Sequence, residues 1–179
     1  MRIISGKWGG RRISPPKNMP YTRPTTDIAK EGLFNILQNR MNFEGIKTLD
    51  LFGGTGCISY ELASRGAKDL TIIEKDNLMN AFIKNNFTML GEQNVKVLNM
   101  DVFSYLNSCS ESFDFIFAGP PYALGSIDDL PKMIHAKKII AKGGFFVLEH
   151  TPRNQFEKFE GFRFLRNYGT TLFSFFVNE

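Results

Sequence analysis

One stretch of the sequence, residues 48–56, constrains the fold more than any other part of the chain. It opens as an apolar run that ends at Asp50 and continues as a loop with glycines at positions 53, 54 and 56. Beyond the loop, Ile58, Leu62 and Ala63 recur at helical spacing. A strand, a glycine turn and a helix in this order form the first unit of an open α/β sheet, which binds ligands outside the carboxyl ends of its strands. Because glycine has no Cβ atom to keep a ligand away from backbone N–H groups, we predict a nucleotide-like cofactor at this loop.

The order of residues in the loop argues against two common phosphate-binding motifs. A dinucleotide-binding loop has a third glycine where this chain has Ser59, and a P-loop has a lysine where this chain has Cys57. The pattern Asp50-x-Phe52-x-Gly54-x-Gly56 instead resembles motif I of the S-adenosylmethionine-dependent methyltransferases. The alternative is a structural glycine turn in another kind of α/β domain.

Strand and helix patterns alternate along the rest of the chain. We predict strands near residues 48–52, 70–74, 95–100, 113–118, 144–150, 162–168 and 171–177. We predict helices near residues 25–40, 58–65, 77–90, 102–106 and 127–140. Alternating strands and helices followed by a terminal hairpin indicate an α/β fold, with a mostly parallel sheet and antiparallel terminal strands.

Three acidic residues end successive predicted strands: Asp50, Glu74 and Asp101. Since the carboxyl ends of parallel strands meet at one edge of a sheet, the three side chains should surround the glycine loop. An acid that ends the second strand can accept hydrogen bonds from ribose hydroxyls. Asp101 could accept from an adenine amine, because a carboxylate is an acceptor only, and Asp50 would lie near the cationic methionine part. The predicted cofactor-binding residues are Asp50, Phe52, Gly53, Gly54, Thr55, Gly56, Glu74, Lys75, Asp101 and Val102.

A rigid turn, Gly119-Pro120-Pro121-Tyr122, follows the predicted fourth strand. The two prolines fix the backbone and leave carbonyl groups without helical partners. A fixed carbonyl can accept a hydrogen bond from a base amine, and a neighbouring aromatic ring can stack on the base. Catalysis would then rest on positioning and electrostatics. We predict that these four residues form the catalytic turn, with a proline turn that merely closes the strand as the alternative.

Residues 1–30 are strongly basic, with seven Lys or Arg residues against one acid, Asp27. That segment carries +6, so the rest of the chain carries −2 (4 − 6). We predict a basic β-hairpin extension over residues 1–22, with strands on either side of a Gly9-Gly10 turn, and a Rossmann-like domain over residues 23–179. Aromatic residues among the charges favour nucleic acid as the partner over a solvated charged face. The predicted RNA contacts are Arg2, Lys7, Trp8, Arg11, Arg12, Arg23 and Thr25.

Composition narrows the remaining possibilities. The 179 residues suit one domain with a short appendage. No apolar run approaches the roughly 18–20 residues that span a bilayer, and the N-terminus lacks the apolar segment of a signal peptide. The two cysteines and two histidines have no zinc-binding spacing. We therefore expect a cytoplasmic protein, since isolated thiols suit a reducing compartment, without a metal and without a membrane partner.

Taken together, these motifs resemble the RsmD-type bacterial 16S ribosomal RNA (guanine-N2-)-methyltransferase family, essentially from end to end. The resembling stretches are residues 2–11, 23–27, 33–37, 49–56 and 120–122, of which the first two are the most specific. The resemblance implies a seven-stranded, Rossmann-like class I methyltransferase fold with an N-terminal β-hairpin. It implies S-adenosylmethionine as cofactor, ribosomal RNA or the small ribosomal subunit as partner, and methyl transfer to the exocyclic N2 of a guanine. It also implies cofactor contacts at Asp50, Gly54, Glu74 and Asp101, and base contacts at Pro120 and Tyr122.

The chain departs from this family at one important position. The family's catalytic turn usually begins with aspartate, and its wider relatives have asparagine or serine, but this chain has Gly119. Three outcomes remain open: an active enzyme that uses backbone carbonyls with a nearby acid such as Asp128 or Asp129, a slow enzyme, or a cofactor-binding protein without catalysis. Two further alternatives are a DNA amino-methyltransferase and a non-catalytic RNA-binding factor.

Overall fold

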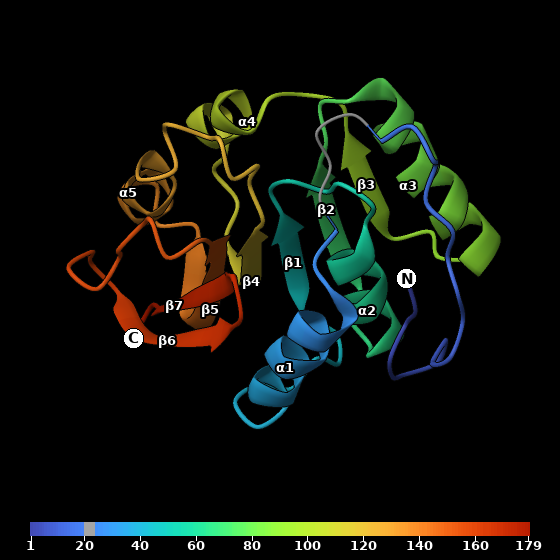
Figure 1. Ribbon diagram of the computed structural model, residues 1–179, viewed down its shortest axis with the longest axis horizontal. Coiled ribbons are helices and arrows are strands. Elements are labelled where there is room, and N and C mark those ends of the chain that lie inside the picture. The colour runs from blue at the N-terminus through green and yellow to red at the C-terminus, as the bar shows by residue number, and fades with distance from the viewer. Residues whose placement is uncertain (20–23) are drawn as a thin grey trace.

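The computed structural model describes residues 1–19 and 24–179, and its strands and helices alternate as the sequence predicts (Figure 1). Arg23, one of the predicted RNA contacts, lies outside the described residues. The elements, in chain order, are α1 (Asp27–Leu37), β1 (Lys47–Asp50), α2 (Cys57–Ser64), β2 (Asp69–Ile73), α3 (Asn77–Leu90), β3 (Val95–Leu98), α4 (Val102–Ser108), β4 (Phe113–Ala118), α5 (Asp129–Ala136), β5 (Ile140–His150), β6 (Phe162–Tyr168) and β7 (Thr171–Val177).

The seven strands form one sheet in the order β3-β2-β1-β4-β5-β7-β6. Strands β1 to β5 run parallel, β7 pairs antiparallel with β5, and β6 pairs antiparallel with β7. This confirms the predicted mostly parallel sheet with antiparallel terminal strands. The strand order reverses between β1 and β4, so the carboxyl ends of these two strands flank the switch point where open α/β sheets bind their ligands.

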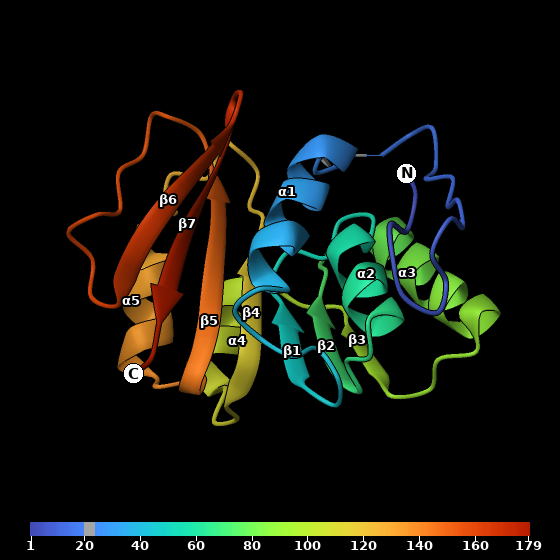
Figure 2. The ribbon, with the colours of Figure 1, turned by 90° about the horizontal axis from the view of Figure 1, so that it is seen from below.

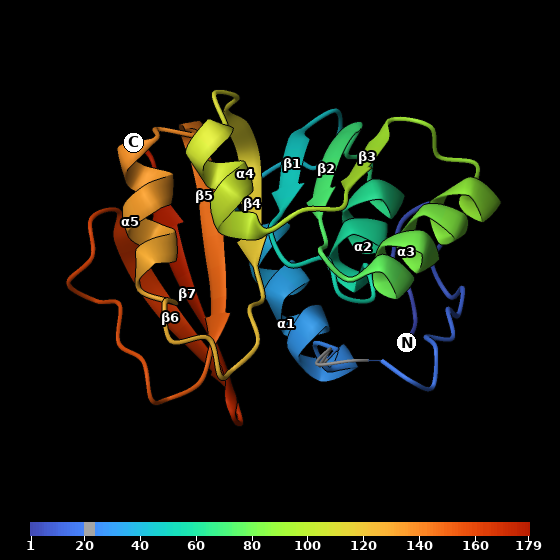
Figure 3. The same ribbon diagram turned by 90° about the horizontal axis from the view of Figure 1, so that it is seen from above.

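Helices cover both faces of the sheet. Figure 2 shows α1 and α2 on one face, and Figure 3, from the opposite side, shows α4 and α5 on the other. Side chains follow the alternation that a strand imposes: Ile72 and Phe115 pack in the cluster beneath α1, α2 and α3, whereas Ile73 and Ile116 pack in the cluster beneath α4 and α5. Strands β2 and β4 therefore contribute to two cores, which fixes their register, because a one-residue shift would exchange the two faces.

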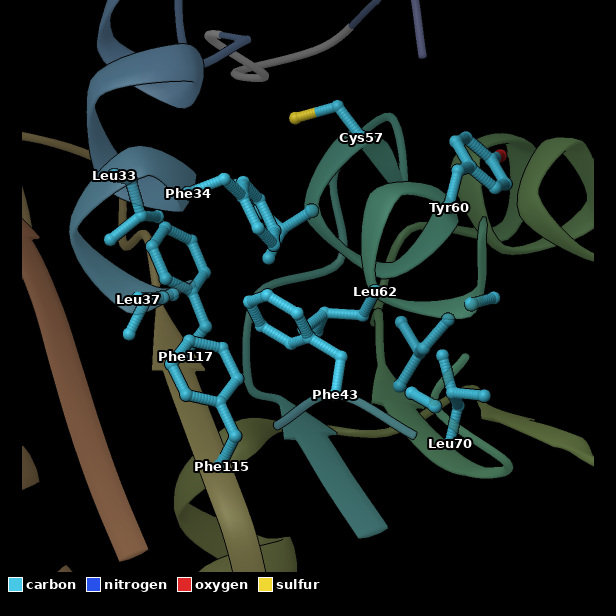
Figure 4. Packing of buried hydrophobic residues seen from close by; sticks show 14 of the residues in the cluster. Leu33, Phe34, Leu37, Phe43, Cys57, Tyr60, Leu62, Leu70, Phe115 and Phe117 are labelled. Carbon is cyan, nitrogen blue, oxygen red and sulfur yellow. The ribbon is translucent and has the colours of Figure 1, made fainter. Parts of the chain in front are cut away.

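Helix α1 is held over the sheet by a cap and an apolar face. The Thr26 side chain accepts a hydrogen bond from the N–H of Ala29 at 3.2 Å and begins the helix. Leu33 and Leu37, both fully buried, lie beside Phe117 of β4 (Figure 4). This packing brings Thr25, which precedes the cap, to the carboxyl end of β5, where its hydroxyl group donates to Glu149.

The two arms of the N-terminal segment pair antiparallel, but over fewer residues and around a longer turn than the predicted hairpin. Its only described strand pairing is an isolated antiparallel bridge between Arg2 and Arg12, and residues 5–10 form turns instead of strands. The segment lies against α2 and α3 (Figure 1), with Ile3, Trp8 and Ile13 in the same apolar cluster as α2. Two interactions order the segment: backbone hydrogen bonds between its two arms, such as Ile3 N–H to the Arg11 carbonyl (2.9 Å) and Ile13 N–H to the Met1 carbonyl (3.0 Å), and burial of these side chains against the body.

A buried ionic cluster fixes this segment to α2. The carboxylate of Glu61, which is fully buried, accepts hydrogen bonds from the backbone N–H groups of Ile4 (2.8 Å) and Ser5 (3.0 Å). It also lies 3.8 Å from the ammonium of buried Lys30 and 2.8 Å from the guanidinium Nε of Arg65. We call Glu61, Lys30 and Arg65 the Glu61 cluster. The Glu61 carboxylate pairs with both cations and accepts from the N-terminal amides, so it joins the segment, α1 and α2.

Some element ends differ from those predicted. Strand β3 ends at Leu98 instead of Met100, and α5 ends at Ala136 instead of Ile140. The chain turns after α5 at Lys138, which has a φ of 54°, and Ile140 already belongs to β5. Among the helices that the structure describes, none combines the length and apolarity needed to cross a membrane.

Candidate functional site

The glycine loop after β1 is built around positions that exclude a side chain. Gly54 and Gly56 have φ values of 57° and 82°, in the left-handed region that favours glycine. A Cβ atom at Gly53 would come within 2.7 Å of the Ile72 side chain, and one at Gly56 within 2.7 Å of the Tyr60 ring. The loop therefore packs directly on β2 and α2, and α2 begins immediately behind it at Cys57.

Asp50, at the end of β1, is the most unusual group at this edge of the sheet. It is 2% exposed, and its Oδ2 accepts a hydrogen bond from the Ser59 hydroxyl at 3.0 Å. Its Oδ1 is buried without a hydrogen-bond partner among the described residues. Burial raises the pKa of Asp50 to about 7. Hydrogen bonds from the Ser59 hydroxyl and the Phe52 backbone N–H partly offset this effect, and the nearby Glu74 and Glu149 carboxylates increase it. A buried acceptor atom of this kind fits a ligand that carries a positive charge or an N–H group.

Glu74 connects the glycine loop to the second strand. Its Oε2 accepts from the N–H of Gly54 at 2.7 Å, and its Oε1 accepts from the N–H of Asp76 at 2.8 Å. The carboxylate is thus fixed between the loop and the start of α3. Lys75 is exposed, and its carbonyl accepts from the Asn99 amide at 2.9 Å, which ties the ends of β2 and β3 together.

Asp101 lies at the same edge but at the start of a helix. Because β3 ends at Leu98, Asp101 becomes the N-cap of α4, and its Oδ1 accepts from the N–H of Ser104 at 3.1 Å. The side chain is exposed, whereas the next residue, Val102, is buried. Phe52 is partly exposed and Thr55 is buried. The structure therefore brings the predicted cofactor-binding residues to one edge of the sheet, with Asp101 also serving the fold as a cap.

The predicted catalytic turn follows β4 at the switch point. Pro120 is buried and Pro121 is exposed, and the Pro121 carbonyl accepts from the N–H of Leu124 at 2.9 Å. The Tyr122 hydroxyl lies 3.5 Å from Oε1 of Glu149 and 3.3 Å from the Thr171 hydroxyl. The Tyr122 hydroxyl is thus directed toward the carboxyl end of β5 and the first residue of β7.

Sequence reasoning missed Glu149, the last residue but one of β5, which lies at the same carboxyl edge of the sheet. Its Oε2 accepts from the Thr25 hydroxyl at 2.6 Å, and the side chain is 6% exposed. A signal was available, because Glu149 is a fourth acid at the carboxyl end of a parallel strand. Thr25, predicted to contact RNA, therefore has an observed place in the site as a partner of Glu149.

The predicted RNA contacts of the N-terminal segment divide into two groups. Arg2, Arg11 and Arg12 are exposed. Trp8, by contrast, is 7% exposed, and its backbone N–H donates to Ser64 at 3.0 Å. The prediction of Trp8 as a surface contact is therefore corrected: its indole fills the core beside α2. Lys7 lies 2.9 Å from Glu92 and 4.3 Å from the Trp8 ring centre, so its charge is partly balanced within the protein.

Across residues 1–19 and 24–179, no group of three or more His, Cys, Asp or Glu side chains is placed to hold a metal ion. The ligand-binding features at the carboxyl edge of the sheet are instead a glycine loop and carboxylates.

The strand order, the glycine loop and the acidic edge define the class I methyltransferase fold. The chain superposes on a Thermus thermophilus 16S rRNA N2 methyltransferase, RsmC, solved with AdoMet and guanosine, with a TM-score of 0.69 and 23% identity over 87% of this chain and 44% of that one. This likeness shows the fold. A second Thermus thermophilus structure, of a hypothetical protein, superposes more closely, with a TM-score of 0.85 and 26% identity over 100% of this chain and 99% of that one.

The family follows from the sequence matches. Residues 1–177 match the family model described as "Conserved hypothetical protein 95". The chain is 30% identical over 154 residues to the "Ribosomal RNA small subunit methyltransferase D" of Escherichia coli strain K12, a match that covers 86% of this chain and 76% of that protein. The chain belongs to this RsmD family.

Proposed function

We propose that the protein is an S-adenosylmethionine-dependent methyltransferase that modifies the exocyclic N2 of a guanine in the RNA of the small ribosomal subunit. The observation that carries the proposal is Oδ1 of Asp50, a buried acceptor without a described partner beside the glycine loop. The name of the Escherichia coli relative supports small-subunit ribosomal RNA as the substrate.

The residues present fit the cofactor by charge and by shape. Asp50 would hold the cationic methionine part, and the glycine loop would lie along the cofactor without side chains in the way. Glu74 would accept from ribose hydroxyls, and Asp101 would accept from the adenine amine. When bound, the cofactor supplies a methyl group on a positively charged sulfur.

The chain's own contribution to the reaction is to position the base and to exclude water. The Gly119 and Pro120 carbonyls are held by the proline turn, and Tyr122 lies beside them for stacking on the base. Burial of Pro120 and Glu149 lowers the local dielectric constant, which strengthens hydrogen bonds to the amine. Positioning and electrostatics of this kind need no covalent intermediate with the protein.

Two measurements test the proposal. Calorimetry with S-adenosylmethionine should show binding, and tritium from the labelled methyl group should appear in undermethylated small ribosomal subunits. Large subunits and fully methylated small subunits are the matched controls, which should acquire little label. Cofactor binding without transfer to any of these particles would instead identify a cofactor-binding RNA factor.

Replacing Arg11 and Arg12 together with Ala should weaken RNA binding and reduce its salt dependence. Each lost phosphate contact should lower the slope of log affinity against log salt by about 1. The matched control is the double replacement of Lys138 and Lys142, which are exposed near the amino end of β5, at the far end of that strand from the glycine loop. Filter binding over a salt series measures both pairs. Equal slopes for the two double variants would show that the N-terminal arginines do not contact RNA.

A further inference from the structure

The end of β5 brings a carboxylate to the position where this chain lacks one. Ala118 of β4 pairs with Leu148 of β5 in the parallel register, so Gly119 and Glu149 are the next residues on neighbouring strands. A Cβ atom built on Gly119 would lie 3.5 Å from Oε2 of Glu149. The Glu149 carboxylate thus lies in contact with the position where an acidic side chain at residue 119 would begin.

The same geometry favours glycine at position 119 when position 149 is a glutamate. A Cβ atom on Gly119 would also lie 3.1 Å from Cε1 of Phe117, closer than most Cβ contacts. An aspartate at position 119 would crowd Phe117 and bring a second negative charge against Glu149. Like charges at this separation oppose each other's ionisation. A carboxylate on a side chain at position 119 would therefore lie next to the Glu149 carboxylate.

Two hydroxyl groups determine the direction of the Glu149 carboxylate. The Thr25 hydroxyl donates to Oε2 at 2.6 Å, and the Tyr122 hydroxyl lies 3.5 Å from Oε1. Thr25 comes from the segment before α1 and Tyr122 from the catalytic turn. An ionised carboxylate accepts at about four positions, and these contacts keep its oxygens toward the turn.

We propose that Glu149 is a catalytic residue that accepts a hydrogen bond from the target amine, in place of the side chain absent at Gly119. This inference rests on the proposed function. During transfer the amine nitrogen forms the new N–C bond with its lone pair, and the S–C bond breaks with its electrons remaining on sulfur. The amine then loses one proton, which Glu149 receives and passes to water. Gly119 leaves room for the target amine, and Glu149 supplies the negatively charged acceptor.

The test compares Glu149→Gln with the double variant Gly119→Asp/Glu149→Gln. We expect E149Q to lower the transfer rate on undermethylated small subunits by about 10²–10³, the usual loss for one well-placed polar group. Its affinity for guanosine, measured by calorimetry, should fall about tenfold or more, as for a hydrogen bond to a charged group. The double variant should regain at least part of both losses, because the new carboxylate then meets a neutral amide. Gly119→Asp alone should be impaired, since the two carboxylates would repel.

Controls separate chemistry from folding. Melting temperature should match the wild type in E149Q, and so should affinity for S-adenosylmethionine at pH 8, where Asp50 is mostly ionised in both proteins. Glu160→Gln, which changes an exposed glutamate paired with His135, should retain full activity. Retention of both the transfer rate and guanosine affinity in E149Q would overturn the inference while leaving the proposed function intact. The inference would also be overturned if a folded double variant regained neither. A wild-type protein that transfers no methyl group would refute the proposed function, and guanosine affinity that does not depend on Glu149 would then refute the inference as well.

Discussion

Replacing Asp50 with Asn should lower the affinity for S-adenosylmethionine by about 10- to 100-fold at pH 8, the cost of losing a hydrogen bond to a charged group. The reason is the buried Oδ1, which has no described partner, at the end of β1 where the glycine loop begins. A neutral amide is nearly isosteric with the carboxylate but cannot balance a positive charge. Isothermal calorimetry measures the change, and equal affinities for wild type and variant would remove Asp50 from the binding site.

The same variant should also lose the pH dependence of binding. Asp50 has a pKa of about 7 in the free protein, because burial disfavours its charged form. A cation binds the ionised form, so wild-type affinity should rise as pH increases through about 7, with release of a proton. The side-chain amide of the D50N variant cannot titrate, so its affinity should stay flat over that range apart from groups that both proteins share. A parallel rise in both proteins would assign the pH dependence to another group.

Asp50 should affect the stability of the free protein in the opposite direction. Its folded pKa is raised from 3.8 to about 7, so the folded state binds the proton more tightly than the unfolded state does. Its stabilising contribution is therefore complete below about pH 3.8 and is lost as pH rises through about 7. The free energy of unfolding of wild type relative to D50N should fall across this window, which urea titration at several pH values measures.

Replacing Glu61 with Ala should lower the free energy of unfolding by about 3–5 kcal/mol, because it removes one partner from a buried ionic pair. The variant would leave the ammonium of Lys30, which is 1% exposed, without its buried carboxylate. It would also remove the acceptor of the Ile4 and Ser5 N–H groups. Urea unfolding monitored by circular dichroism measures the loss.

A matched control is available in Glu44→Ala. Glu44 pairs with Lys68 at 3.6 Å, and both side chains are mostly exposed. An exposed ion pair contributes about 0–1 kcal/mol, so this variant should be nearly as stable as the wild type. A Glu61→Ala variant no less stable than Glu44→Ala would show that the N-terminal segment is held by its apolar side chains alone.

The fold was largely predictable because its signals are local. Periodicity placed α3, β4, β6 and β7 at their observed ends. The acids at the strand ends were also predictable, since parallel strands bring their carboxyl ends together. Asp101 was placed at the correct edge although its role as the cap of α4 was not foreseen.

Long-range contacts account for what sequence reasoning missed. The sequence around Trp8 indicates an exposed aromatic residue among charges. Trp8 is instead buried beside α2, where its backbone N–H donates to Ser64, 56 residues away. The burial of Glu61 was not foreseen, because nothing local indicates that every residue of α2 is buried. The proposed role of Glu149 follows only from its position next to Gly119, and this proximity arises from the pairing of β4 with β5. None of these relationships leaves a periodic pattern in the sequence.

The hydrogen bond from the Gly54 N–H to Glu74 has a kinetic consequence. This bond within the protein anchors the loop to the residue that follows β2, so the conformational entropy of the loop is lost during folding and not during association. Cofactor association should therefore proceed at a rate set by diffusion and orientation, without a slow loop rearrangement. Without Glu74, the glycine loop would have to become ordered while the cofactor binds. The association rate constant would then fall together with the affinity.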